Sequence, residues 1–365
     1  MYQERVRIVF AGGGTGGHIF PALAIADAVK AMRPDAEILF VGTRDKIESR
    51  VIPRTGYRFV PIWISGFQRG LQLRNLLFPL KVAVSVMQSF LHIRRFKPHV
   101  AVGTGGYVSG PVLWAASRMG VPVVLHESNS VPGVATRLMA GRAQIVFTAF
   151  QETSAKLDRT DNVQLVGTPV RQSAGRVQRS EGLARFGLAA EKKTLLVLGG
   201  SLGAASVNNA VLPIVDRLAA SGIQLLWQTG RYQDSAIQET LRDKTFGWVG
   251  PFIEDMESAY AAADLAVCRA GAATVAELAA TGTPAILVPY PRATDDHQTQ
   301  NARLLEQASA AIMIPDGDLD AQLCSAVEEL MANDARREAM RAAALRLTKA
   351  DAARVIATAL LDIVA

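Results

Sequence analysis

The sequence is poor in cysteine and in aromatic residues, and both shortages narrow the range of functions. Only Cys268 and Cys324 occur among 365 residues. They lack metal-ligand spacing, so we expect neither a disulfide framework nor a zinc site, and a reducing cytosol fits best. Aromatic residues make up 6% of the chain and are not interleaved with basic residues, so no nucleic-acid stacking platform is predicted. The polar start, Met1 to Arg7, runs directly into an apolar stretch, and we expect no secretory signal.

Acidic residues are missing from one long window. Between Glu48 and Glu127 there is none, whereas ten Lys and Arg residues fall inside it. Residues 1–170 carry 20 basic and 10 acidic residues, and subtraction from the totals of 39 and 33 leaves 19 and 23 for the rest. The two halves therefore carry opposite net charge, and the first half is expected to attract an anionic surface.

The same window is strongly apolar around Lys81. It contains Leu76, Leu77 and Leu80, but Pro79, Gln88 and His92 interrupt it, which makes a membrane-spanning helix a poor fit. Two interpretations remain open: an ordinary core helix, or a helix that docks on an anionic membrane surface.

Strand-like and helix-like segments alternate along the whole chain. The strand-like runs are residues 6–11, 38–41, 59–62, 100–102, 121–126, 144–147, 194–198, 223–228, 265–268 and 285–289. The length exceeds what one hydrophobic core usually supports, so we expect two α/β domains, residues 1–168 and 172–348, joined near Gly167–Arg171. A last helix at about 351–365 is expected to pack back on the first domain. Such alternation predicts parallel sheets, which bind ligands beyond the carboxyl ends of their strands. Two such sheets facing each other would hold a central cleft.

Two glycine-rich turns, residues 12–17 and 199–204, each follow an apolar run and open a helix-like segment. Backbone N–H groups at a helix N-terminus favour phosphate, so the turns predict two phosphate-bearing ligands. The first turn is not a dinucleotide fingerprint, because His18 and Pro21 occupy the helix start and no acidic residue ends the next strand. A tight turn without a ligand is the alternative for either one.

Six motifs carry a family resemblance. They are residues 13–24 (GGTGGHIFPALA), 105–111 (GGYVSGP), 126–129 (HESN), 199–204 (GGSLGA), 268–272 (CRAGA) and 296–302 (DHQTQNA). In this order they resemble the MurG family of bacterial cell-wall glycosyltransferases and span nearly the whole chain. The resemblance implies a GT-B fold of two Rossmann-like domains facing a central cleft, and an inverting hexosyltransferase without a tightly bound metal. It also implies transfer of N-acetylglucosamine from UDP-N-acetylglucosamine to the C4 hydroxyl of lipid I, the undecaprenyl-diphosphate-linked muramyl-pentapeptide.

The product, lipid II, would connect the chain with peptidoglycan synthesis, cell shape and cell division. A peripheral position on the cytoplasmic face of the cell membrane, with anionic lipids and not nucleic acid as partners, follows from the resemblance together with the charge pattern. Three alternatives remain open: a UDP-N-acetylglucosamine 2-epimerase, a glycolipid synthase, and a non-enzymatic lipid-binding module.

The resemblance also implies donor-site residues. Ser201 and nearby backbone N–H groups would bind the diphosphate beside Arg171, the Ile253 backbone would recognise uracil, and Glu277 would accept hydrogen bonds from the ribose. The full donor set is Thr15, Gly16, Gly17, Asn129, Arg171, Ser201, Ile253, Ala272, Ala273, Thr274, Glu277, His297 and Gln298.

Several donor-site positions have a second interpretation. Leu202 and His297 stand where many family members have Gln. Glu277 alone would suit a solvated helix acid, and the pair Asp295 and Asp296 would suit a metal ligand pair or, more readily, a helix cap.

The acceptor-binding residues implied by the resemblance are Gly14, Thr15, His18, Tyr107 and His126. His18 has the right chemistry for the general base that removes the acceptor hydroxyl proton. The alternative role for His18 is a hydrogen-bond donor to the acceptor diphosphate, and Glu127 is the competing base.

Overall fold

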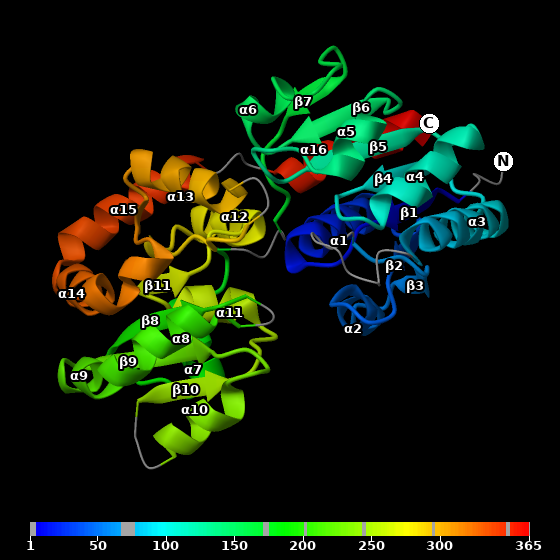
Figure 1. Cartoon of the computed structure of the whole chain (residues 1–365). Helices are drawn as coiled ribbons and strands as arrows, with labels where there is room; N and C mark the ends of the chain where they lie inside the picture. Colours follow the sequence, from blue (N-terminus) through cyan, green and yellow to red (C-terminus); the bar gives the residue numbers. More distant parts are fainter. Residues whose placement is uncertain are drawn as a thin grey trace. The chain divides into compact units, whose positions relative to one another are not determined.

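The chain forms two compact units in the computed structural model. It describes residues 5–66, 77–170, 175–200, 203–242, 246–293, 296–347 and 351–364. The first unit comprises Met1–Gln172 and Lys349–Ala365, and the second comprises Ser173–Thr348 (Figure 1).

The first unit is built on a seven-stranded sheet in the order β3-β2-β1-β4-β5-β6-β7, with every pair of neighbours parallel. Its strands are β1 (Arg7–Ala11), β2 (Glu37–Gly42), β3 (Arg58–Pro61), β4 (Val100–Gly103), β5 (Val123–Glu127), β6 (Ile145–Thr148) and β7 (Val163–Leu165). Its helices are α1 (Gly16–Met32), α2 (Glu48–Arg54), α3 (Phe78–Phe96), α4 (Ser109–Arg118), α5 (Val134–Ala140), α6 (Gln151–Ser154) and α16 (Ala352–Val364).

Strand β1 is buried on both faces because helices cover both sides of the sheet. Ile8 and Phe10 share one core cluster with residues of α1 and α16, while Val9 and Ala11 point into a second cluster with residues of α3 and α4. This two-sided burial explains why β1 is a continuous apolar run after Arg7 and not an alternating one. The C-terminal helix α16 thus contributes to the core of the first unit (Figure 1).

The second unit has a six-stranded parallel sheet in the order β10-β9-β8-β11-β12-β13. Its strands are β8 (Lys193–Leu198), β9 (Ile223–Gln228), β10 (Gly247–Gly250), β11 (Leu265–Cys268), β12 (Ala285–Leu287) and β13 (Ala311–Met313). Its α-helices are α7 (Arg179–Phe186), α8 (Ala205–Val211), α9 (Val215–Ala220), α10 (Asp234–Leu241), α11 (Met256–Ala262), α12 (Ala272–Thr281), α13 (His297–Gln307), α14 (Leu319–Ala332) and α15 (Asp334–Leu347), and two 3₁₀ turns are η2 (Leu212–Ile214) and η4 (Asp316–Asp318).

The predicted α/β class with parallel sheets is confirmed in both units. In each, the strand order reverses beside the first strand, between β1 and β4 and between β8 and β11. The crevice at the carboxyl ends of these strands is where doubly wound sheets bind ligands. Both glycine-rich turns leave the sheet at this point, after β1 and after β8. Among the residues that the structure describes, no helix combines the length and apolarity needed to cross a membrane.

Candidate active site

The first glycine turn packs closely against Gly105 and Gly106, which follow the neighbouring strand β4. A Cβ on Gly105 would lie 2.5 Å from Nδ1 of His18, and a Cβ on Gly106 would lie 2.3 Å from the carbonyl oxygen of Gly13. Both glycines also have positive φ, of 102° and 79°. Only glycine allows the two turns to approach so closely at these positions.

His18 is held in the first turn of α1 by residue Thr104. Its Nδ1 lies 3.1 Å from the carbonyl oxygen of Thr104, and the Thr104 hydroxyl donates to the carbonyl of His18 at 2.7 Å. Because a carbonyl only accepts, Nδ1 must carry the proton of this hydrogen bond. In the neutral ring Nε2 then carries the lone pair, which is the tautomer that a general base requires.

Glu48, the first residue of α2, fixes the first glycine turn. Its buried carboxylate accepts from the backbone N–H of Gly14 at 3.1 Å through one oxygen. The other oxygen accepts from the N–H and the hydroxyl of Thr43, at 3.0 and 2.7 Å. Sequence analysis did not single out Glu48. A dinucleotide fingerprint has its acidic residue at the end of the second strand, and Glu48 lies six residues beyond the end of β2.

Tyr107 lies close to the first glycine turn, because a Cβ on Gly14 would be 3.2 Å from its ring. Burial, with Glu48 and Asp45 adding, raises the pKa of Tyr107 to about 12, so its hydroxyl stays protonated.

The two neighbouring residues at the end of β5 have different environments. The buried Glu127 carboxylate accepts from the N–H and side-chain amide of Asn129, from the N–H of Gly133 and from the hydroxyl of Thr136. Four donors therefore hold both of its oxygens and order the turn between β5 and α5.

His126 is fully buried, and its Nε2 lies 3.0 Å from the carbonyl oxygen of Gly167. Burial lowers the pKa of His126 to about 4, so the ring is neutral and Nε2–H donates. The side chain of this predicted acceptor residue thus points into the first unit, not to its surface. The structure brings Gly14, Thr15, Gly16, Gly17, His18 and Tyr107 together.

In the second unit, Gln228 at the end of β9 bonds to the backbone of the glycine turn, as Glu48 does in the first unit. Its amide nitrogen donates to the carbonyl of Gly200 at 2.9 Å, and its amide oxygen accepts from the N–H of Ile253 at 2.8 Å. The backbone N–H of Ile253 is therefore bonded within the second unit. Ser201, Leu202 and Arg171 lie outside the described residues.

The remaining donor-site candidates lie on α12 and α13. Ala272, Ala273 and Thr274 form the first turn of α12, and Glu277 follows one turn later. The oxygen of the Gln298 side chain accepts from the N–H of Tyr290 at 3.0 Å, and half-buried His297 begins α13. Thr299 donates its hydroxyl to the Asp296 carboxylate at 2.7 Å, whereas Asp295 lies outside the described residues. Within the described ranges, no group of three or more His, Cys, Asp or Glu side chains could hold a metal ion.

Arg269 joins the elements around the second glycine turn, although sequence analysis assigned no role to it. Its guanidinium donates to the carbonyl of Val288 at 3.2 Å, to the carboxylate of Asp316 at 2.5 Å and to the hydroxyl of Ser206 at 2.8 Å. It thereby ties the ends of β11 and β12 to the first turn of α8. The motif at 268–272 contained this residue, but nothing in the sequence indicated its partners.

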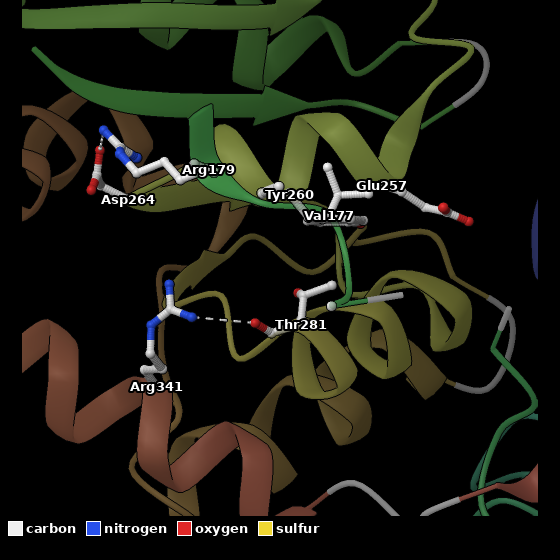
Figure 2. A pocket seen from close by; sticks show the side chains of 10 residues that line it. Val177, Arg179, Glu257, Tyr260, Asp264, Thr281 and Arg341 are labelled. Carbon is white, nitrogen blue, oxygen red and sulfur yellow. Dashed lines mark hydrogen bonds and ion pairs between the residues drawn. The ribbon is translucent and has the colours of Figure 1, made fainter. Parts of the chain in front are cut away.

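A separate cavity of ≈ 180 Å³ lies in the second unit, and none of the predicted site residues lines it (Figure 2). Its two arginines bond within the unit: Arg179 pairs with Asp264 at 3.0 Å, and Arg341 donates to the carbonyl of Thr281 at 3.5 Å. Tyr260 lines the cavity and donates its hydroxyl to the Glu277 carboxylate at 2.8 Å. The cavity therefore lies beside a residue that contacts a predicted site residue.

Known proteins resemble the chain over almost its full length. Residues 8–148 match the glycosyltransferase family 28 N-terminal domain, and residues 194–356 match the family's C-terminal domain. A UDP-N-acetylglucosamine--N-acetylmuramyl-(pentapeptide) pyrophosphoryl-undecaprenol N-acetylglucosamine transferase from Salinibacter ruber is 46% identical, with 98% of this chain and 96% of the relative covered. The enzyme of the same name from Chlorobium luteolum is 44% identical, with 98% and 99% covered. This chain belongs to that transferase family. The resemblance drawn from six motifs is thereby confirmed.

Solved structures agree with this assignment. The crystal structure of Acinetobacter baumannii MurG has a TM-score of 0.72 at 28% identity, with 98% of this chain and 99% of that one covered. The GT-B class is therefore confirmed for this glycosyltransferase family 28 member. A UDP-N-acetylglucosamine 2-epimerase from Neisseria meningitidis has a TM-score of 0.70 at 12% identity, with 98% and 100% covered, which shows a shared fold alone.

Proposed function

We propose that this glycosyltransferase transfers N-acetylglucosamine from UDP-N-acetylglucosamine to the C4 hydroxyl of lipid I, with inversion at the anomeric carbon, and so forms lipid II. The observation that carries the proposal is the identity of 46% to a curated transferase across 98% of the chain. The test is transfer of radiolabel from UDP-N-acetylglucosamine to a short-chain muramyl-pentapeptide diphosphate lipid. Conversion of the donor to its 2-epimer without any acceptor product would contradict the proposal.

The donor binds to the second unit in this proposal. The N-terminus of α12 and the turn after β8 present backbone N–H groups to the diphosphate, which stabilises the departing UDP without a tightly bound metal. The Ile253 carbonyl meets the uracil edge and Glu277 accepts from the ribose. Turnover that survives chelation of divalent ions would support this account, and loss of turnover on chelation would contradict it.

His18 acts as the general base on the acceptor hydroxyl. The hydrogen bond from Nδ1 to Thr104 supports this role, because it leaves the lone pair on Nε2 in the neutral ring. Protein donors hold both oxygens of Glu127, which supports a role in ordering the turn around Asn129 and Gly133.

Two substitutions separate the possible roles of His18. A general base contributes about 10²- to 10⁴-fold in rate, so His18→Ala should lower kcat by that factor at saturating acceptor. His18→Gln keeps an N–H group that can donate a hydrogen bond but takes up no proton, so its kcat should be as low as that of His18→Ala. Both variants should bind UDP-N-acetylglucosamine as the wild type does. Near-normal turnover of His18→Gln would instead make His18 a binding residue.

Helix α3 supports docking of the first unit on a membrane. Its buried residues are Ser85, Ser89, Ile93 and Phe96, whereas large apolar side chains face outward. The exposed ones are Leu77, just before α3, and Leu80, Met87 and Leu91 on α3, at 48–58% exposure, together with Trp114 on α4 and Met119 just beyond its end. Such an outward apolar face marks an interaction site, and Arg94, Arg95 and Lys97 adjoin it at the end of the helix. We take anionic lipid of the cytoplasmic leaflet as the partner, and not nucleic acid. Leu76, which the sequence places in the same stretch, lies outside the described residues.

Vesicle sedimentation tests this docking. Replacement of Leu80, Met87 and Leu91 by Ser should reduce co-sedimentation with phosphatidylglycerol vesicles and leave UDP binding intact. Binding should also weaken as salt rises, because surface attraction is screened. Leu345→Ser is the matched control, because Leu345 is equally exposed but belongs to the second unit. Unchanged co-sedimentation of the triple variant would contradict membrane docking through α3.

A further inference from the structure

One buried hydrogen bond connects two helices of the second unit at the predicted ribose-binding residue. Tyr260 on α11 donates its hydroxyl to Oε2 of Glu277 on α12 at 2.8 Å. The Tyr260 side chain is 4% exposed, so the surrounding core fixes its position. Tyr260 was not among the residues that the sequence singled out, because its spacing from Glu277 has no motif of its own.

We propose that Tyr260 is a positioning residue for donor binding, which orients the Glu277 carboxylate toward the two ribose hydroxyls of a uridine diphosphate ligand. This inference rests on the proposed function, because it requires that Glu277 meets the ribose.

The protonation states of the groups near the Glu277 carboxylate determine which group donates the hydrogen bond. Burial and the nearby Glu277 carboxylate raise the pKa of the Tyr260 phenol well above its usual value. The same two causes raise the pKa of the buried Cys268 thiol, at the end of β11, to about 12. Both groups are therefore protonated at neutral pH. A phenol has a single proton, and Tyr260 donates it to Oε2 of Glu277.

A fixed carboxylate orientation matters for a diol ligand. Two adjacent hydroxyls donate to a carboxylate well only when its plane is set correctly, and a freely turning side chain would lose entropy on binding. Helix α12 fixes the backbone of Glu277, but its side chain has three rotatable bonds beyond that. The hydrogen bond from Tyr260 on α11 restrains the carboxylate end of that side chain.

Binding measurements with two ligands test this role in the full chain. The ligands are UDP and its 2′,3′-dideoxy analogue, measured by calorimetry on the wild type and on Tyr260→Phe, which keeps the ring and removes only the hydroxyl. We expect Tyr260→Phe to bind UDP about tenfold more weakly, within the range for a hydrogen bond to a charged group. It should bind the dideoxy analogue within twofold of wild type. In turnover, the KM for the donor should rise while kcat changes little. Tyr232→Phe, at an exposed tyrosine, is the matched control.

The possible outcomes separate the two proposals. If the wild type binds both ligands equally, Glu277 does not meet the ribose, and the proposed donor site fails together with this inference. If the wild type prefers UDP but Tyr260→Phe keeps that preference, the donor site stands and the role of Tyr260 is refuted. Equal losses for both ligands would show a purely structural effect and would also refute it. In a Glu277→Ala background, Tyr260→Phe should cause no further loss of UDP affinity, and an additive loss would overturn the coupling.

Discussion

His126 should make the stability of the first unit depend on pH in a defined window. In the folded chain its pKa is lowered to about 4 from an ordinary value of 6.5, and burial is the main cause. As pH falls below 6.5, the unfolded chain takes up a proton that the folded chain does not take up until about pH 4. The free energy of unfolding therefore falls across this window and is fully retained above it. The linkage relation gives a loss of about 2.5 kcal/mol at pH 4.5 relative to pH 7.5.

The variant His126→Gln isolates this contribution. A glutamine amide can reach the Gly167 carbonyl as Nε2–H does, but it does not titrate. Urea denaturation between pH 4.5 and 7.5 should show the wild type losing about 2.5 kcal/mol more than His126→Gln. His92, whose pKa burial also lowers, contributes with the same sign in both proteins and cancels in the comparison. Parallel stability curves for the two proteins would refute this account of His126.

Two further predictions concern the glycine turn of the first unit and the donor site of the second. Glu48→Gln should destabilise the first unit by about 2 kcal/mol, because one oxygen that accepts from Gly14 or Thr43 becomes an amide that cannot accept; urea denaturation measures it, and unchanged stability would contradict it. Glu277→Ala should weaken UDP binding by about 1–3 kcal/mol, the range for hydrogen bonds to a charged group; calorimetry showing the wild-type affinity would contradict it.

The sequence predicted the centre of each sheet better than its edges. The strands predicted near residues 6–11, 100–102 and 194–198 correspond to β1, β4 and β8, which are buried on both faces and apolar except for polar residues at the start of β1 and β8. The strands that sequence analysis missed are β7, β10 and β13, and all three lie at sheet edges. They are three or four residues long and partly exposed, and β10 begins with Gly247, so neither length nor an apolar run marks them.

The contacts that shape the site could not be predicted in the same way. The glycine turns were visible because their residue type reflects a backbone requirement, as the close approach of Gly105 to His18 shows. Glu48 and Gln228 were invisible, since each is an ordinary polar residue whose role depends on which strand lies beside the turn. The environment of His126 was hidden for a related reason, because its partner Gly167 is 41 residues away in the sequence.

The side chain that bonds to the glycine turn differs in charge between the two units, and this difference affects which ligand each turn suits. In both units, a polar side chain that lies outside the glycine turn in the sequence bonds to the backbone of that turn. In the first unit it is the carboxylate of Glu48, at the start of α2, and in the second it is the neutral amide of Gln228, at the end of β9. A buried carboxylate repels a nearby phosphate and attracts a positive charge, whereas an uncharged amide has neither effect. On this ground the turn after β8 is the better cradle for a nucleotide diphosphate. This agrees with the donor-binding role proposed for the second unit.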